Sequence, residues 1–166
     1  MGLWLPELGQ RAANPREVKP IGGSHGPSRG NDNALGPCVD HRAAMANALH
    51  PDVIVSIHAD GGPPEGREFH VNYSDPPLND AQAGPTIRFA QPVRDQLVAS
   101  GVQPSTYRGT DALYGRADLA GLNLAQYPSI LIEMGNMKNA EEAAVLTSTE
   151  GSRYAAAVTR GASRHT

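Results

Sequence analysis

The chain has 166 residues, a length within the usual range for a single domain. Apolar residues make up 39% of the chain and charged residues 19%, a composition that excludes a wholly disordered protein. The formal net charge is −3 with histidines neutral, so there is no basic stripe for a phosphate backbone and we expect no nucleic-acid partner. Apolar runs such as residues 53–57, which Ser56 interrupts, fall far short of the ~20 residues that span a bilayer, so no membrane span is expected.

Glycine and proline are concentrated at the start of the chain. They occupy a third of residues 1–27, where no helical or alternating apolar pattern is present. This composition predicts an irregular, poorly ordered segment. The first residues also lack a basic patch followed by an apolar stretch, so we expect no secretory signal there. We therefore predict one globular domain over residues 28–166.

Helical and strand-like patterns alternate through that domain. Helices are predicted over 38–49, 79–100, 140–146 and 151–161. The apolar runs at 53–59 and 128–135 predict strands that are covered on both faces, as in a parallel sheet. Residues 67–74 alternate and predict a half-exposed strand, with His70 on its polar, solvent-facing side. This order indicates an α/β fold with three layers, a mostly parallel twisted sheet between helices on both faces.

Each of the two buried strands ends in a polar residue that can exchange protons. His58 follows the first apolar run and Glu133 follows the second. Sites in open α/β sheets form outside the carboxyl ends of parallel strands, which places both residues at one rim. An imidazole there can bind a metal, and a carboxylate can be a ligand or a general base.

Periodicity alone leaves a structural alternative open for both residues. His58 can be a hydrogen-bonded core histidine, and Glu133 a carboxylate on the surface at a strand end. A nucleophile elbow around Ser24, in the letters GGSHG, is excluded because Pro20 and Pro27 interrupt the strand and helix that the motif requires.

Five ordered blocks of sequence resemble a known family. They are SRGNDN at 28–33, DHRAAMAN at 40–47, SIHAD at 56–60, GRADLAGLN at 115–123 and PSILIEMGNMKN at 128–139. Together they resemble the zinc-dependent N-acetylmuramoyl-L-alanine amidases of the amidase-3 type, which cut peptidoglycan. The blocks extend over about four fifths of the chain, so the resemblance is specific.

The resemblance implies roles for particular residues. It makes His58 a zinc ligand and Glu133 the catalytic carboxylate. Asp60, where asparagine is common in the family, and Asn136, where phenylalanine is common, are expected to contact substrate. Arg116 is a further substrate-binding candidate, and the alternative for it is a structural ion pair with Asp118.

Two further zinc ligands of the family precede the first block, and the sequence does not supply them in the expected order. Only two residues separate His25 from Ser28, which leaves no room for the intervening helix and strand. Glu7 and Glu17 precede His25, the reverse of the family order. We therefore expect the first strand and helix of the amidase to be absent, so that the domain is incomplete at its N-terminus and one zinc ion is not necessarily retained.

The expected activity is hydrolysis of the amide between N-acetylmuramic acid and the L-alanine of the stem peptide by zinc-activated water. The alternative is an inactive remnant that at most binds cell-wall fragments. The resemblance implies a peptidoglycan or muropeptide substrate and a location at the cell wall, although the chain shows no signal peptide. We expect a monomer.

Overall fold

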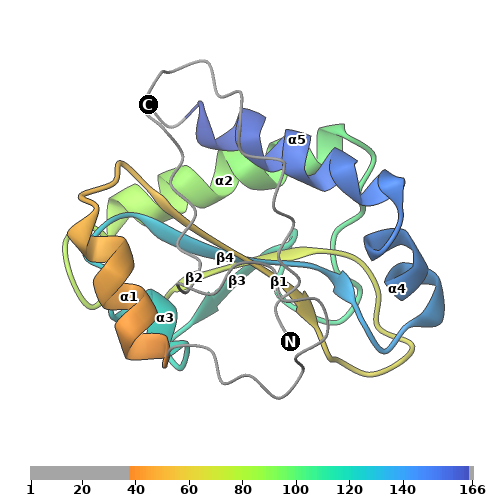
Figure 1. Cartoon of the computed structure of the whole chain (residues 1–166), viewed down its shortest axis with the longest axis horizontal. Helices are drawn as coiled ribbons and strands as arrows, with labels where there is room; N and C mark the ends of the chain where they lie inside the picture. Colours follow the sequence, from red (N-terminus) through yellow and green to blue (C-terminus); the bar gives the residue numbers. More distant parts are fainter. Residues whose placement is uncertain (1–37, 165–166) are drawn as a thin grey trace.

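The computed structural model describes residues 38–164 (Figure 1). A single sheet lies between helices. In chain order the elements are α1 (Val39–Ala48), β1 (Ile54–Asp60), β2 (His70–Ser74), α2 (Gly84–Ala99), β3 (Leu113–Arg116), α3 (Ala120–Asn123), β4 (Ser129–Asn136), α4 (Ala140–Leu146), the short 3₁₀ helix Thr149–Gly151 and α5 (Ser152–Ala162). Within these residues no helix is both long and apolar enough to cross a bilayer.

The predicted helices and strands all form, with small differences at their ends. The strand predicted over 128–135 is largely buried, as expected. The strand predicted over 53–59 is not covered on both faces, because β1 lies at an edge of the described sheet and Ile57 is 41% exposed. Helix α2 begins at Gly84 rather than residue 79, because the preceding residues form a turn in which the Gln82 and Ala83 amides donate to the Asn79 carbonyl. Pro85 then occupies the first turn of the helix, where its missing N–H leaves no hydrogen bond unmade. The predictions for residues 1–27 lie outside the described residues.

The four strands are arranged in the order β1-β4-β2-β3. β1 pairs with β4 in parallel, β4 with β2 antiparallel, and β2 with β3 in parallel. Two of the three pairings are therefore parallel, which confirms the mostly parallel sheet. The antiparallel pairing in the middle was not predicted.

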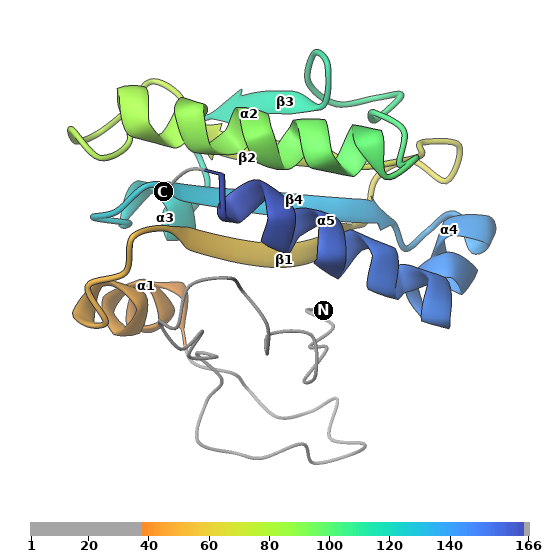
Figure 2. The same ribbon diagram turned by 90° about the horizontal axis from the view of Figure 1, so that it is seen from above.

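Helices α2 and α5 cover one face of this sheet (Figure 2). Side chains of the two helices pack against alternate positions of β2 and β4 and form the main hydrophobic core with them. This core includes Val71, Phe89, Val93, Leu97, Ile130, Ile132, Tyr154 and Val158. Helices α1 and α3 lie toward the opposite face (Figure 1), which confirms the three layers. Burial of aliphatic side chains at about 25 cal/mol per Å² makes this core the principal source of stability.

The opposite face of the sheet is polar. It is formed by the other alternate positions, among them His58 on β1, Glu133 on β4 and His70 on β2. The half-exposed strand predicted over residues 67–74 is therefore wrong in its exposure, because β2 is an inner strand and His70 is only 2% exposed.

The packing of α2 against α5 gives a test of this core. A Cβ added at Gly161 of α5 would lie 2.5 Å from the Cα of Val93 on α2, so the two helices would have to separate. We expect Gly161→Ala to lower the free energy of unfolding by about 1–3 kcal/mol, measured by urea denaturation.

The control is Gly121→Ala in α3. A Cβ there would meet Val39 at 3.6 Å, an ordinary van der Waals distance, so stability should be unchanged or slightly higher. Equal effects of the two substitutions would contradict the close approach of α2 and α5.

Candidate active site

Three residues that can exchange protons form a row across the polar face. His58 on β1 is the register partner of Glu133 on β4, and Glu133 is in turn the partner of His70 on β2. Register partners point their side chains to the same face of a sheet, and neighbouring strands are about 4.8 Å apart. The structure thus brings together His58 and Glu133, which are 75 positions apart in sequence, and adds His70 on the other side.

The environment of Glu133 favours a carboxyl group that is only partly ionised at neutral pH. Burial raises its pKa to about 7, with a further upward contribution from the neighbouring negative charge of Asp60. Arg116 opposes the shift. A carboxyl group with this pKa can both accept and return a proton near pH 7, as a general base and acid must.

His58 lies on β1, next to Glu133, and part of its surface remains exposed. Desolvation and the positive charge of Arg42 lower its pKa below the usual value. The imidazole is therefore neutral at neutral pH, which is the form that binds metal ions.

His70 is the largest difference between expectation and structure at the site. It is buried rather than solvent-facing, and burial lowers its pKa to about 4. Two tyrosine rings pack against it in T-shaped arrangements, with ring centroids 6.2 Å away for Tyr107 and 6.0 Å for Tyr114. The sequence prediction was wrong here because an alternating pattern identifies two faces of a strand but not what covers each face.

Asp60 lies where β1 ends, after an irregularity in the register between His58 and Asp60. Its carboxylate accepts hydrogen bonds from the Tyr107 hydroxyl, at 2.8 Å, and from the Gly61 amide, at 2.7 Å. Burial and this bond raise the pKa of Tyr107. The ring also lies against Gly62, where a Cβ would come within 2.5 Å of it, so the loop after β1 and Tyr107 form one packed wall beside the site.

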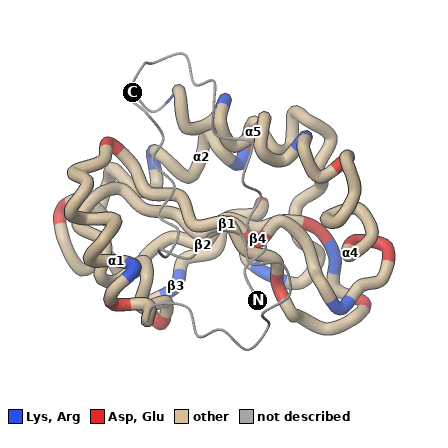
Figure 3. Tube along the Cα trace, viewed as in Figure 1, with Lys and Arg blue, Asp and Glu red and all other residues tan. Residues whose placement is uncertain are grey.

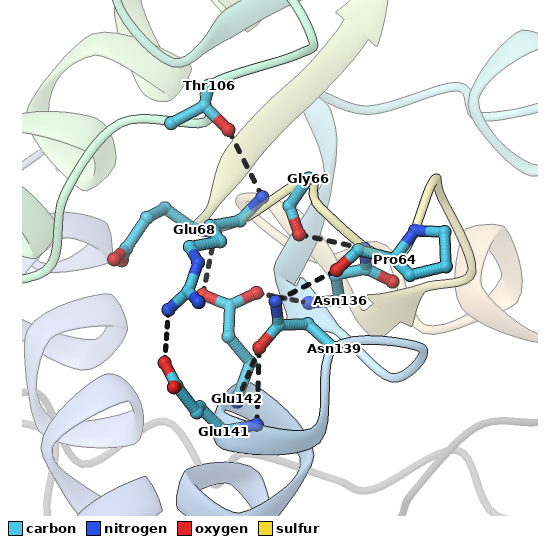
Figure 4. Close-up of polar contacts among 9 residues, drawn as sticks. Pro64, Gly66, Glu68, Thr106, Asn136, Asn139, Glu141 and Glu142 are labelled. Carbon is cyan, nitrogen blue, oxygen red and sulfur yellow. Dashed lines mark hydrogen bonds and ion pairs between the residues drawn. The ribbon is translucent and has the colours of Figure 1, made fainter.

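Hydrogen bonds from the buried end of β4 hold the loop that follows β1 in place (Figure 4). The Asn136 amide donates to the carbonyl of Gly66 at 2.8 Å. It also donates to the carbonyl of Pro63 at 2.6 Å. Asn139 donates to the carbonyl of Pro64 at 2.9 Å. Because Asn136 is fully buried and bonded in this way, the structure gives it the role of holding the loop beside the site.

A carboxylate of α4 completes the network. Glu142 accepts hydrogen bonds from the backbone amides of Glu68, at 2.7 Å, and Asn136, at 2.8 Å. Arg67 forms an ion pair with Glu141 on the same helix, and Figure 3 shows acidic and basic residues close together around α4. These contacts join the start of β2, the end of β4 and α4 into one support for the site.

Arg116, at the end of β3, forms an ion pair with Asp118, the structural role that the sequence left open as the alternative to substrate binding. Its guanidinium donates to both carboxylate oxygens of Asp118, at 2.8 and 2.6 Å, and lies 5.5 Å from the centre of the Tyr114 ring. The positive charge of Arg116 also lowers the pKa of Glu133, against the larger effect of burial. A contact between Arg116 and substrate remains a prediction.

A catalytic zinc ion is usually held by three protein ligands and a water molecule. Within residues 38–164 no group of three or more His, Cys, Asp or Glu side chains is placed to hold a metal ion. His58, neutral and partly exposed, fits as a single ligand, but the described residues do not complete the set. His25, Glu7 and Glu17 lie outside them.

Two side chains of this site were missed from the sequence. Tyr107 lies in a loop with no periodic pattern, so no signal in the sequence could have placed it beside Asp60. Asn72 has the same parity as His70 in the alternating strand, and that parity could have placed it on the face of Glu133.

The raised pKa of Glu133 predicts a pH-dependent stability. The folded chain holds this proton up to about pH 7, whereas the unfolded chain releases it near the usual value of 4.5. The stabilising contribution is therefore complete below pH 4.5 and is lost as pH rises to about 7. We expect Glu133→Gln to be more stable than the parent at pH 8, by on the order of 1–2 kcal/mol because exposure reduces the effect. The difference should shrink toward pH 4.5.

Urea denaturation of both proteins across this pH range measures the difference directly. A difference that stays constant with pH, or a less stable variant at pH 8, would contradict the desolvated carboxyl group.

Comparison with known proteins gives the family. Residues 27–164 match the family model described as N-acetylmuramoyl-L-alanine amidase. The chain is 67% identical over 135 residues to an N-acetylmuramoyl-L-alanine amidase of Mycobacterium tuberculosis, a match covering 81% of this chain and 56% of the relative.

Solved structures agree. The N-acetylmuramyl-L-alanine amidase Ami1 of Mycobacterium smegmatis superposes with a TM-score of 0.77 at 63% identity, covering 83% of this chain and 64% of that one. For the apo form of Ami1 from Mycobacterium abscessus the TM-score is 0.78 at 59% identity, covering 82% and 65%. The chain thus spans little more than half the length of the curated relative. Because the family model matches most of its residues, this chain belongs to the N-acetylmuramoyl-L-alanine amidase family.

Proposed function

We propose that this chain hydrolyses the amide that joins the lactyl group of N-acetylmuramic acid to the L-alanine of the peptidoglycan stem peptide. Membership of the amidase family supports this substrate. The observation that carries the proposal is a carboxyl group with a pKa of about 7 between two neutral imidazoles on one face of the sheet. Peptidoglycan lies in the bacterial cell wall, which is where we expect the protein to act.

Glu133 supplies the proton transfers of this reaction. Its carboxylate takes a proton from the attacking water as the oxygen bonds to the carbonyl carbon of the amide. The carboxyl group then gives that proton to the amide nitrogen as the carbon–nitrogen bond breaks, which leaves the lactyl carboxylic acid and the free amine of L-alanine. Glu133 returns to its starting state after each turnover.

His58 is the residue we propose as a zinc ligand. When bound in such a site, zinc polarises a carbonyl oxygen and lowers the pKa of its water. Because the described residues do not complete a three-ligand set, zinc binding is measured separately from hydrolysis in the experiment below.

The side walls of the site would position the substrate. The Asp60 carboxylate and the Tyr107 hydroxyl hold each other at the end of β1, and the buried Asn136 holds the loop that follows. We propose that this wall faces the peptide, with Asp60 as the residue closest to the reacting groups because its charge acts on Glu133.

A defined muropeptide, N-acetylmuramoyl-L-alanyl-D-isoglutamine, tests the proposal. Mass spectrometry should detect release of the dipeptide by the parent protein with zinc supplied. Glu133→Gln should lower kcat by at least about a hundredfold, since the proton transfers contribute that much in typical enzymes, while zinc content measured by atomic absorption stays unchanged.

Ser129→Ala is the matched control, because Ser129 lies on the same strand and has no hydrogen-bond partner for its hydroxyl among the described residues. It should leave kcat unchanged. Hydrolysis by Glu133→Gln at the parental rate would rule out the assigned role. A parent that binds the muropeptide without zinc and never cleaves it would instead favour the binding-only alternative.

A further inference from the structure

Four buried side-chain atoms in the described part of the chain have no hydrogen-bond partner, and all belong to the polar face of β2 and β4. They are His70 Nδ1, Asn72 Oδ1, Ser129 Oγ and Glu133 Oε2. Buried polar atoms in folded proteins almost always have a partner, from the protein or from an ordered water. The location of these four atoms therefore carries information about the site.

Three of the four side chains belong to neighbouring positions on one face of the β2–β4 pair. His70 and Glu133 are directly opposite each other in the antiparallel pair, so their Cβ atoms are about 4.5–5.5 Å apart. Asn72 is two residues along β2 on the same face, opposite Leu131. Ser129 lies four residues from Glu133, toward the other end of β4.

Two of the three groups, Asn72 and His70, have contacts that orient them. The Asn72 Nδ2 group donates to the Leu131 carbonyl at 3.3 Å, which leaves Oδ1 as the unpartnered acceptor. The rings of Tyr107 and Tyr114 both pack against His70, with interplanar angles of 83° and 68°. Of the two oxygens of Glu133, only Oε2 is both buried and unpartnered.

These three atoms match the hydrogen-bonding capacity of one water molecule. A water can donate to Asn72 Oδ1 and to ionised Glu133 Oε2, and it can accept one hydrogen bond from His70 if Nδ1 carries the proton. Because both other partners are acceptors, the imidazole has to be the donor. Burial keeps His70 neutral, with its pKa at about 4, so a single proton resides on one of its two nitrogens.

We infer that His70 is a positioning residue for Glu133, acting through one ordered water that is shared with Asn72. The inference rests on the proposed function for its catalytic consequence. A carboxylate held at Oε2 keeps Oε1 directed at the attacking water. Less orientational entropy is then lost when the groups align for the proton transfer. His70 itself does not touch the substrate in this account.

The tautomer of His70 provides a test that needs no catalysis. At pH 8, where Glu133 is ionised, long-range ¹H–¹⁵N NMR should show the proton of His70 on Nδ1. Glu133→Leu should change the Nδ1 shift, because it removes one of the acceptors that hold the water. A proton on Nε2 would overturn the inference even if the protein proves to be an active amidase.

Kinetics with the muropeptide provide the second test. His70→Phe keeps a buried ring against the two tyrosines and removes both nitrogens, so kcat should fall by about tenfold or more while KM stays within about twofold. His70→Asn places an amide near the position of Nδ1 and should keep kcat within about threefold of the parent. His70→Gln places its amide near the position of Nε2 and should resemble His70→Phe.

Adding His70→Phe to Glu133→Gln tests whether His70 acts on catalysis through Glu133 or through the stability of the fold. His70→Phe should have no further effect on residual hydrolysis there, because residues that act through one another are not additive. Ser129→Ala, which removes the one unpartnered atom outside the cluster, should change neither the His70 tautomer nor kcat.

Unchanged kcat in His70→Phe, or equal losses in the Asn and Gln variants, would overturn the inference. Should His70→Phe fail to fold, the Asn and Gln variants still decide the matter. A parent without hydrolysis, combined with a proton on Nδ1, would count against the proposed function and not against the hydrogen-bonded cluster.

Discussion

The register of β4 between its two neighbours is the constraint on which the site depends. β4 carries Ile130, Ile132 and Met134 into the core on one face and Glu133 onto the other. A slip of one residue would exchange the two faces, so the aliphatic side chains would lose their burial and the carboxyl group would enter the core. The same aliphatic packing that stabilises the sheet therefore fixes Glu133 between His58 and His70.

Partial burial gives Glu133 a pKa suited to proton transfer near neutral pH. Burial desolvates the carboxyl group of Glu133, which disfavours its charged form and raises its pKa. The negative charge of Asp60 raises the pKa further, to about 7. Desolvation also lowers the pKa values of His58 and His70. One physical cause thus makes the acid easier to protonate and both bases harder to charge. The network of Asn136, Asn139 and Glu142 keeps the neighbouring loop in place around them.

The sequence predicted the parts of the fold that depend on local patterns. Two short apolar runs, each ending in a polar residue, predicted parallel strands whose ends bring His58 and Glu133 together, and the pairing of β1 with β4 has this register. The helices followed from their apolar spacing and from proline and glycine at their ends.

What the sequence could not predict depends on contacts between distant segments. The strand β3 has only four residues, too few for a periodic signal, and follows two residues with positive φ, Asp111 and Ala112. His70 is buried because β3 pairs with β2 and Tyr107 packs against the imidazole. Both lie far from β2 in the sequence, so the pattern of β2 alone does not reveal them. Asn136 lies within a block that resembles the family, at a position where phenylalanine is common, and its function in the fold follows from a loop some seventy residues earlier.

The central claim is that the scissile amide binds on the polar face, at the carboxyl group between two imidazoles. A crystal structure of the Glu133→Gln variant with intact N-acetylmuramoyl-L-alanyl-D-isoglutamine measures this most directly. The account predicts the lactyl amide within hydrogen-bond distance of the substituted side chain, with His58 on one side and His70 on the other. A muropeptide bound elsewhere, with residue 133 remote from the amide, would contradict it.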